Sequence, residues 1–182
     1  ISWQYPLVET ATALVFFLLY MQFGLRAQFF VYLVYAGFLI VLFVYDLWYY
    51  LIPDRVSLPG IITAFILSYA VLDITIVSLM LGTLIGGGFF LLQYAVSRGK
   101  WIGGGDIRLG ALMGMMLGWP HIIVALFIAY VTGSVIGIFL ILFNKKKWQS
   151  QVPFGTFLSA ATVVTFFFGP QIIDFYRDLF FL

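Results

Sequence analysis

The chain has 182 residues, of which 64% are hydrophobic and only 9% are charged, whereas a soluble domain carries about 25% charged residues. An apolar excess of this size would cover the surface as well as the core, which excludes a soluble globular domain and indicates an integral membrane protein. The net charge of +2 does not indicate nucleic-acid binding, because the basic residues lie in short loops rather than in one stripe. With no cysteine and one histidine, His121, these residues cannot form a disulfide, a thiol nucleophile, a thiolate metal site or a histidine metal cluster.

Seven apolar runs predict seven membrane-spanning helices. A bilayer core about 30 Å thick needs about 20 apolar residues per helix, and open strand edges are not tolerated there. The tail that follows the last run, "QIIDFYRDLFFL", alternates charged and aromatic residues and is expected either to lie at the membrane interface or to be a disordered end. The sequence therefore predicts an all-α, polytopic membrane helix bundle. Its spans are residues 5–23, 29–49, 57–72, 75–97, 104–118, 120–143 and 153–170.

The nine basic residues divide unevenly between the two sides of this bundle. Two of them, Arg26 and Arg177, fall on one side, and the other seven fall on the opposite side. Because cytoplasmic loops are enriched in Lys and Arg, the opposite side is predicted to be cytoplasmic, with residue 1 cytoplasmic and residue 182 external. The residues on that cytoplasmic side are Arg55, Arg98, Lys100, Arg108, Lys145, Lys146 and Lys147.

Glycines recur at a spacing of four in three of the predicted spans. This spacing places small residues on one helix face, where two backbones can approach closely. We expect these faces to tighten the bundle, and a groove for a substrate helix is the alternative. The glycines are Gly82 and Gly86, then Gly110, Gly114 and Gly118, and finally Gly133 and Gly137.

Four acidic residues fall within or beside spans on the predicted cytoplasmic side. Glu9 lies near the start of the first span, where a helix N-terminus favours a negative charge, which leaves Asp46, Asp54 and Asp106. Asp46 ends a long apolar run, but "LWYYLI" follows it, so its helix is expected to continue. Asp106 opens a span just after three glycines, which leave the backbone room to approach another group closely. Asp46 and Asp106 should thus lie at similar depth, and an ionisable residue inside a span is a functional-site hypothesis. Asp54 follows Pro53 and is interpreted as a helix-capping or turn residue.

A pair formed by Asp46 and Asp106 would suit acid–base chemistry. Two carboxylates that face each other in a low-dielectric site share one proton, because both cannot stay ionised. One can take a proton from a water that attacks a peptide carbonyl while the other donates a proton, as in aspartic proteases. This chemistry requires no metal, thiol or cofactor. The alternative is a buried ion pair of Asp46 with Arg108 or Arg55.

Four ordered segments carry the motifs of one enzyme family. "GGGD" fits the G-x-G-D signature of membrane aspartic proteases, within "KWIGGGDIRLGALMGMMLG". "DLWYYLIPDRVSLPG" surrounds the first aspartate, and "VPFGTFLSAATVVTFFFG" contains a P-F-G segment with Thr156 where proline is usual. The fourth segment, "ISWQYPLVETATALVF", opens the chain. Together they resemble the type IV prepilin peptidases, also called prepilin leader peptidases, through nearly the whole chain.

The resemblance implies that Asp46 and Asp106 are the catalytic pair and that Gly103 and Gly105 are the signature glycines. It implies an eight-span enzyme of the bacterial inner membrane, with its active site towards the cytoplasm and seven of the spans in this chain. Such enzymes cut the short basic leader from type IV prepilins or type II secretion pseudopilins, without a cofactor. The expected partners are that substrate helix and membrane lipid, with no nucleic acid, and the oligomeric state is left open.

Two further elements are assigned to the substrate. Arg108 is expected either to meet the acidic residue that follows the cleavage site or to be a positive-inside anchor. Pro153, Phe154 and Gly155 are expected either to shape the substrate entrance or to pack the start of a helix. The loop 103–105 is expected to give an extended substrate backbone room and hydrogen-bond partners.

The match at Ile1 corresponds to the second span of two-function members of this family. In those members a first span and a cytoplasmic domain, often with a four-cysteine zinc site, precede it, and that domain goes with N-methylation of the new N-terminus by S-adenosylmethionine. We therefore expect residues 1–182 to be a single peptidase domain from a longer protein. That protein is expected to methylate, with zinc and S-adenosylmethionine bound in the preceding domain, although these residues hold no evidence of it.

Three other functions compete with this interpretation. The nearest is another G-x-G-D protease that cuts within spans, such as a signal-peptide-peptidase-like enzyme, but "LIPD" and "PFG" favour the prepilin branch. A small ion-coupled transporter would use the aspartates as a relay and would place them near the bilayer midplane. A non-catalytic assembly factor would leave two intramembrane aspartates unexplained.

Overall fold

The computed structural model describes residues 3–143 and 152–180, and within these residues it contains seven α-helices and no strand. Each predicted span overlaps one helix, so the all-α bundle is confirmed. Five of the helices are long and apolar enough to cross a membrane, as expected for a multi-pass membrane protein. In chain order the helices are α1 (Gln4–Phe23), α2 (Ala27–Tyr49), α3 (Asp54–Ala70), α4 (Ile76–Ser97), α5 (Gly104–Leu117), α6 (His121–Leu142) and α7 (Phe154–Phe180).

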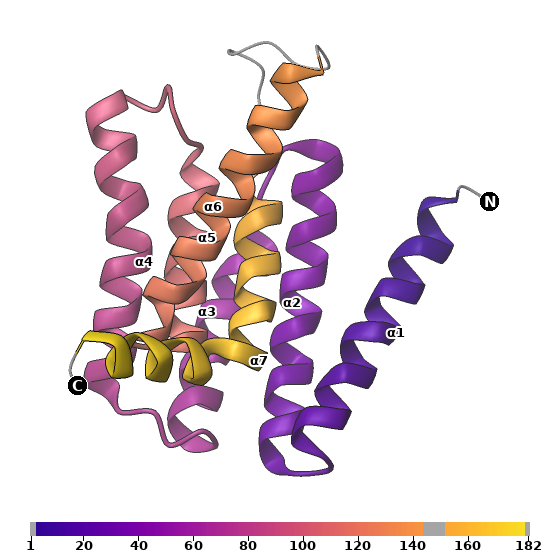
Figure 1. Ribbon diagram of the computed structural model, residues 1–182, viewed down its shortest axis with the longest axis vertical. Coiled ribbons are helices and arrows are strands. Elements are labelled where there is room, and N and C mark those ends of the chain that lie inside the picture. Colours follow the sequence, from indigo (N-terminus) through magenta and orange to yellow (C-terminus); the bar gives the residue numbers. More distant parts are fainter. Residues whose placement is uncertain (1–2, 144–151, 181–182) are drawn as a thin grey trace.

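Consecutive helices run in opposite directions and are joined by short loops (Figure 1). The ends of α2, α4 and α6 and the starts of α3, α5 and α7 therefore lie at one end of the bundle, the upper end in Figure 1, and the start of α1 lies on the same side but apart from them. We call it the aspartate end, because Asp46 and Asp106 lie there. The described basic residues at this end are Arg55, Arg98, Lys100 and Arg108. Lys145, Lys146 and Lys147 lie outside the described residues.

Helix α5 is the centre of the bundle and packs on α4 through glycines. Gly82 and Gly86 of α4 lie against Gly114 and Gly110 of α5, and a Cβ atom on Gly82 would lie 2.6 Å from the carbonyl oxygen of Gly114. No side chain fits between these two backbones. The expectation of tight packing is confirmed for these four glycines, and the alternative of a substrate groove along this face is wrong.

The remaining glycines of the three series have other surroundings. Gly118 ends α5 with a φ of 66°, in the left-handed region that favours glycine. Gly133 lies against the rings of Phe154 and Phe157, whereas nothing would lie within 4 Å of a Cβ atom on Gly137. The spacing of four therefore does not by itself identify a contact.

We expect Gly86→Ala to destabilise the bundle and Gly88→Ala, on the same helix, to leave it nearly unchanged. A Cβ atom on Gly86 would collide with the backbone of Gly110, whereas one on Gly88 would meet only Leu84, at 3.9 Å. Overpacking of this kind costs about 1–3 kcal/mol. Thermal unfolding of both variants in one detergent measures the difference, and equal midpoints would contradict this account of the α4–α5 contact.

A buried hydrogen-bond network joins α2, α3 and α5. The Tyr35 hydroxyl donates to the Ala64 carbonyl over 3.0 Å and lies 2.7 Å from the Ser68 hydroxyl. Ser68 in turn donates to the Met115 carbonyl over 3.0 Å. Because buried polar groups are costly unless paired, this network fixes how α2 and α5, the helices that carry the two aspartates, sit relative to each other.

Helix α7 changes direction near Pro170. Its first part runs along the bundle, and its last part, yellow in Figure 1, runs across the end opposite the aspartates. Proline lacks the N–H that would continue the helical hydrogen bonds, and its ring clashes with the preceding turn, so a bend is expected there. Residues 171–180 are helical, so a disordered end is wrong for them, and their transverse course suits the expected interfacial position.

Candidate active site

Asp46 lies near the end of α2 and contacts the start of α7. Its side chain is 5% exposed, and Oδ2 accepts the backbone N–H of Thr156 over 2.8 Å. The backbone N–H of Gly155 interacts with the same carboxylate. N–H groups in the first turn of a helix have no partner within that helix, and the positive end of the helix dipole favours an anion. Asp46 therefore caps α7 from a neighbouring helix.

Gly155 is what allows this close approach. A Cβ atom on Gly155 would lie 2.9 Å from Asp46 Oδ2 and 3.1 Å from Ile52 Cδ1. Phe154 anchors the same turn by packing its ring on Tyr130, with ring centroids 4.9 Å apart. The P-F-G segment thus packs the start of α7, which was one of its two expected roles, and it delivers backbone donors to Asp46.

Asp106 occupies the first turn of α5. It is 8% exposed, and its Oδ2 accepts the backbone N–H of Gly103, the residue that caps α5, over 3.2 Å. The carboxylates of Asp106 and Asp46 lie close enough for the charge of Asp46 to act on Asp106. The structure thus brings together the two residues that the sequence singled out.

The glycines before Asp106 differ in their surroundings. A Cβ atom on Gly105 would lie 2.9 Å from the Cβ of Ile52, so the space beside Gly105 is already filled. Nothing would lie within 4 Å of a Cβ atom on Gly104. The expectation that the whole loop 103–105 leaves room for a substrate is therefore wrong at Gly105, which instead allows Ile52 to approach.

Ile52 is a residue of this site that sequence reasoning missed. It lies in the loop between α2 and α3, is buried, and contacts the positions of both Gly105 and Gly155. It therefore separates the first turn of α5 from the first turn of α7, beside Asp46. The sequence signal was an isoleucine directly before Pro53, in a loop where a polar residue is expected.

Arg108 pairs with Asp54 rather than with Asp46. The Nη2 atom of Arg108 lies 2.7 Å from Oδ1 of Asp54, and both side chains are partly exposed. Asp54 is in the first turn of α3, so it serves as a helix-start residue, as expected, and also joins α3 to α5. Within residues 3–143 and 152–180 the only other ion pair is Arg177 with Asp174. The alternative of a buried ion pair of Asp46 with Arg108 or Arg55 is wrong.

A polar pair that the sequence analysis also missed lies near Asp106. The Tyr130 hydroxyl lies 2.8 Å from Gln93 Nε2 and 3.1 Å from Gln93 Oε1. It also interacts electrostatically with Asp106. Tyr130 also packs against the rings of Phe90 and Phe154. A glutamine inside an apolar span was the available signal.

The comparisons with known proteins identify the family. The type IV leader peptidase family matches residues 33–138, more than half of the chain, and this segment contains both aspartates and "GGGD". The chain belongs to the type IV leader peptidase family. The helices α1 and α7 lie outside the matched segment, so Asp46 and Asp106 belong to the shared part of this peptidase family, whereas the α7 donors to Asp46 lie beyond it.

Individual relatives extend the similarity to nearly the whole chain. The prepilin leader peptidase/N-methyltransferase of Bacillus subtilis is 31% identical over 97% of this chain and 71% of its own length. The protein of that name from Legionella pneumophila is 31% identical over 96% of this chain. The one from Pseudomonas aeruginosa is 28% identical over 95%. The chain spans 62% and 61% of the latter two proteins. No solved structure matches this chain.

One cavity of the bundle lies away from the aspartates. It has a volume of about 380 Å³ and lies at the opposite end of the bundle, where Gln28, His121 and Gln171 contribute to its lining. Across the described residues there is also no group of three or more His, Cys, Asp or Glu side chains that could hold a metal ion. The buried carboxylates of Asp46 and Asp106 are therefore the candidate active site.

Proposed function

We propose that this chain is the peptidase part of a prepilin leader peptidase, which removes the short basic leader from type IV prepilins or type II secretion pseudopilins. The observation that carries the proposal is the pair of buried carboxylates, Asp46 and Asp106, at the same end of the bundle and inside the segment that matches the family. The relatives that are named prepilin leader peptidase/N-methyltransferase support the same substrate class.

The chemistry follows from two carboxylates that share one proton. The ionised aspartate takes a proton from a water whose oxygen attacks the scissile carbonyl carbon. The protonated aspartate supports the developing oxyanion and then donates its proton to the leaving nitrogen as the carbon–nitrogen bond breaks. The products are a leader with a new carboxylate and a mature segment with a new N-terminal amine. Gly155 and Thr156 hold Asp46 in place throughout, and Gly103 holds Asp106.

We place the site at the cytoplasmic face of a bacterial inner membrane. The four basic residues at the aspartate end in the described part of the chain support this orientation, because cytoplasmic loops are enriched in Lys and Arg. Both aspartates lie in the terminal turns of their helices. This position does not fit a transporter, which would hold its relay near the bilayer midplane.

A panel of substrates tests the proposal. We expect the protein in membranes to cut a prepilin with a basic leader and to leave a leaderless version of the same helix intact. A signal-peptide-peptidase-like enzyme would cut the leaderless span as well, and a transporter would cut neither. Gel mobility of the substrates measures all three results, and an intact basic-leader prepilin would contradict the proposed activity.

Arg108 is proposed to contact the acidic residue that follows the cut. We expect Arg108→Ala to slow processing about tenfold or more for a substrate with this acid, but not for one with a neutral residue there. Asp54→Asn removes the same ion pair while it keeps the arginine, so it should change neither rate. Because an exposed ion pair contributes about 0–1 kcal/mol, both variants should unfold near the wild-type temperature. Equal losses from Arg108→Ala on both substrates would instead favour a positive-inside anchor.

The methyltransferase activity in the relatives' names is proposed only for a longer protein that contains this chain. S-adenosylmethionine would be the methyl donor, and both it and zinc would bind outside residues 1–182. Methylation of the new N-terminus, measured by the mass of the mature product with and without S-adenosylmethionine, tests this part separately from cleavage.

A further inference from the structure

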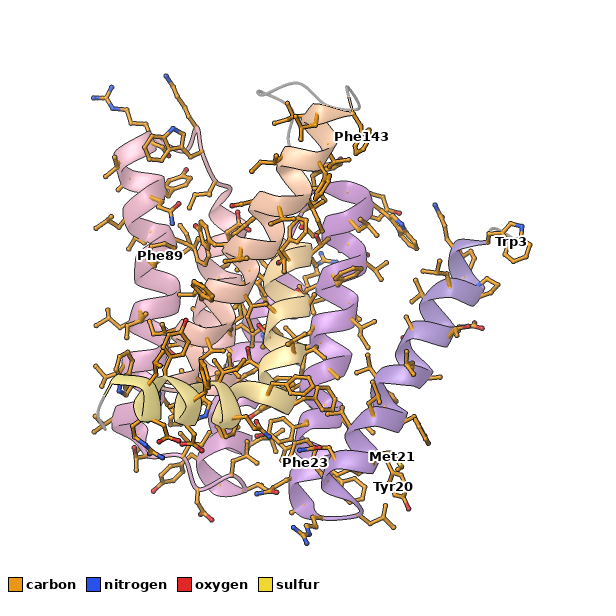
Figure 2. All side chains as sticks on the ribbon, in the orientation of Figure 1. Trp3, Tyr20, Met21, Phe23, Phe89 and Phe143 are labelled. Atoms are coloured by element: carbon orange, nitrogen blue, oxygen red, sulfur yellow. The ribbon has the colours of Figure 1, made fainter. Side chains whose placement is uncertain are left out.

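Helix α1 is attached to the rest of the bundle by one half only. Figure 1 shows α1 and α2 meeting at the end opposite the aspartates and diverging towards the aspartate end. In Figure 2, Phe23 lies where the two helices meet, and Trp3 projects from the free end of α1. Leu19 is the only buried residue of α1, and the Phe23 ring stacks on Tyr32 with centroids 4.7 Å apart.

The divergence leaves a groove of about 320 Å³ between α1 and the neighbouring faces of α2 and α7. Its lining is apolar except for two hydroxyl groups, those of Thr12 and Ser159. The Thr12 hydroxyl is already bonded to the Val8 carbonyl of its own helix, over 2.7 Å. Ser159 is 1% exposed, and its hydroxyl has no hydrogen-bond partner among the described residues. The groove therefore presents an apolar surface, because the Ser159 hydroxyl is buried behind it.

The groove leads to the aspartates. On α2 its lining includes Phe43 and Leu47, which flank Asp46 within about one helical turn. On α7 it begins at Ser159, one turn after the Gly155 backbone that contacts Asp46. A helix that lies in the groove would therefore bring its end at the aspartate side next to Asp46.

The charges beside the groove favour a basic segment. Helix α1 carries Glu9 as its one charged residue, and α2 carries Asp46 as its one charged residue. Helix α7 has no basic residue before Arg177, which lies in its transverse part. Arg98 and Lys100 instead follow α4, on the far side of the bundle from α1 (Figure 1). The charges that the groove-lining helices carry at this end are thus acidic, which favours a basic peptide segment, whereas the described basic residues of the aspartate end lie on α3, on α5 and after α4.

We propose that the groove between α1 and the α2–α7 pair is the docking site for the apolar helix of the substrate. The helix lies along α2 and α7, its start reaches Asp46, and the basic leader passes Glu9 on its way out of the membrane. This inference rests on the proposed peptidase function. The substrate helix is thus assigned to a groove that is open from the side, and not to the glycine faces of α4 and α5, which occupy each other.

Blocking the groove tests the proposal. We expect Ala160→Trp to slow processing of a membrane-embedded prepilin at least tenfold, because Ala160 lines the groove and is exposed. Cleavage of a short soluble peptide that contains only the leader and the cut should remain, since it needs the aspartates but not the groove. Leu92→Trp, at an exposed position of α4, is the matched control and should process both substrates normally.

Cross-linking gives a second measurement that does not depend on how well the blocked variant folds. Because the chain has no cysteine, Ala160→Cys in an Asp106→Asn background can form a disulfide only through that position. We expect it to cross-link to a cysteine in the apolar segment of the uncut prepilin, and we expect Leu92→Cys not to do so.

The outcomes separate this inference from the proposed function. If the wild-type protein leaves prepilin uncut, the proposed function fails and the docking site fails with it. If the wild-type protein cuts prepilin, two results overturn the docking site alone. One is normal prepilin processing by Ala160→Trp without a cross-link from Ala160→Cys, as for a groove filled by lipid. The other is a disulfide between two copies of Ala160→Cys, as for a groove filled by a second chain.

Discussion

Replacing either Asp46 or Asp106 with asparagine is expected to abolish leader removal without unfolding the protein. Asparagine has the shape of aspartate but cannot exchange a proton, and positioned acid–base groups contribute about 10²–10⁴-fold to a rate. The amide oxygen of Asp46→Asn can still accept the Thr156 N–H, and that of Asp106→Asn can still accept the Gly103 N–H. The rate of prepilin conversion and the unfolding temperature, measured on the same preparations, check the two parts of this prediction.

The control for these variants is Asp54→Asn, which makes the same substitution at the same end of the bundle. Asp54 is partly exposed, pairs with Arg108, and is not part of the buried carboxylate pair. It should process prepilin at nearly the wild-type rate. Substantial activity from Asp46→Asn or Asp106→Asn, or an equal loss in Asp54→Asn, would contradict the assignment of the pair.

Gly155→Ala is expected to have the second-largest effect, although it changes no ionisable group. Its Cβ atom would lie 2.9 Å from Oδ2 and 3.0 Å from Cγ of Asp46, so either the carboxylate or the start of α7 must move. Displacing a reacting group by about 1 Å can cost about 100-fold in rate. We expect a loss of 10- to 100-fold, mostly in kcat, because Gly155 positions the carboxylate and does not bind the substrate helix.

The matched control is Gly137→Ala, since a Cβ atom there meets no atom within 4 Å. It should leave both kcat and KM close to wild type, which shows that added bulk in a span is not harmful in itself. A Gly155→Ala variant whose KM rises while kcat is unchanged would place Gly155 in substrate binding instead of in the support of Asp46.

The helices could be predicted from the sequence because apolar runs of bilayer length are a strong physical signal. All seven helices begin and end within a few residues of the predicted spans, except that α7 continues past Pro170. Asp46 and Asp106 could be found for a related reason, since a carboxylate inside an apolar run is costly and conspicuous. Their proximity followed from the alternation of helix direction and from the resemblance to the family.

The groups that surround the aspartates could not be predicted in the same way. Asp46 is held by backbone N–H groups of α7, which carry no side-chain signature and lie 110 residues away. The partner of Arg108 depends on which face α3 turns towards α5, and the sequence does not encode that face locally. Ile52 stands out only as an apolar residue in a loop, and its position between Gly105 and Gly155 exists only in the folded bundle.

The mass of a prepilin after incubation with this protein in membranes shows whether Asp46 and Asp106 remove the leader. We expect the wild-type protein to convert the prepilin to a product lighter by its basic leader, cut directly before the apolar helix. We also expect the Asp46→Asn and Asp106→Asn variants to leave the full mass unchanged. The same shortened mass from an aspartate variant, or a cut inside the apolar helix, would contradict the claim that these two carboxylates remove the leader.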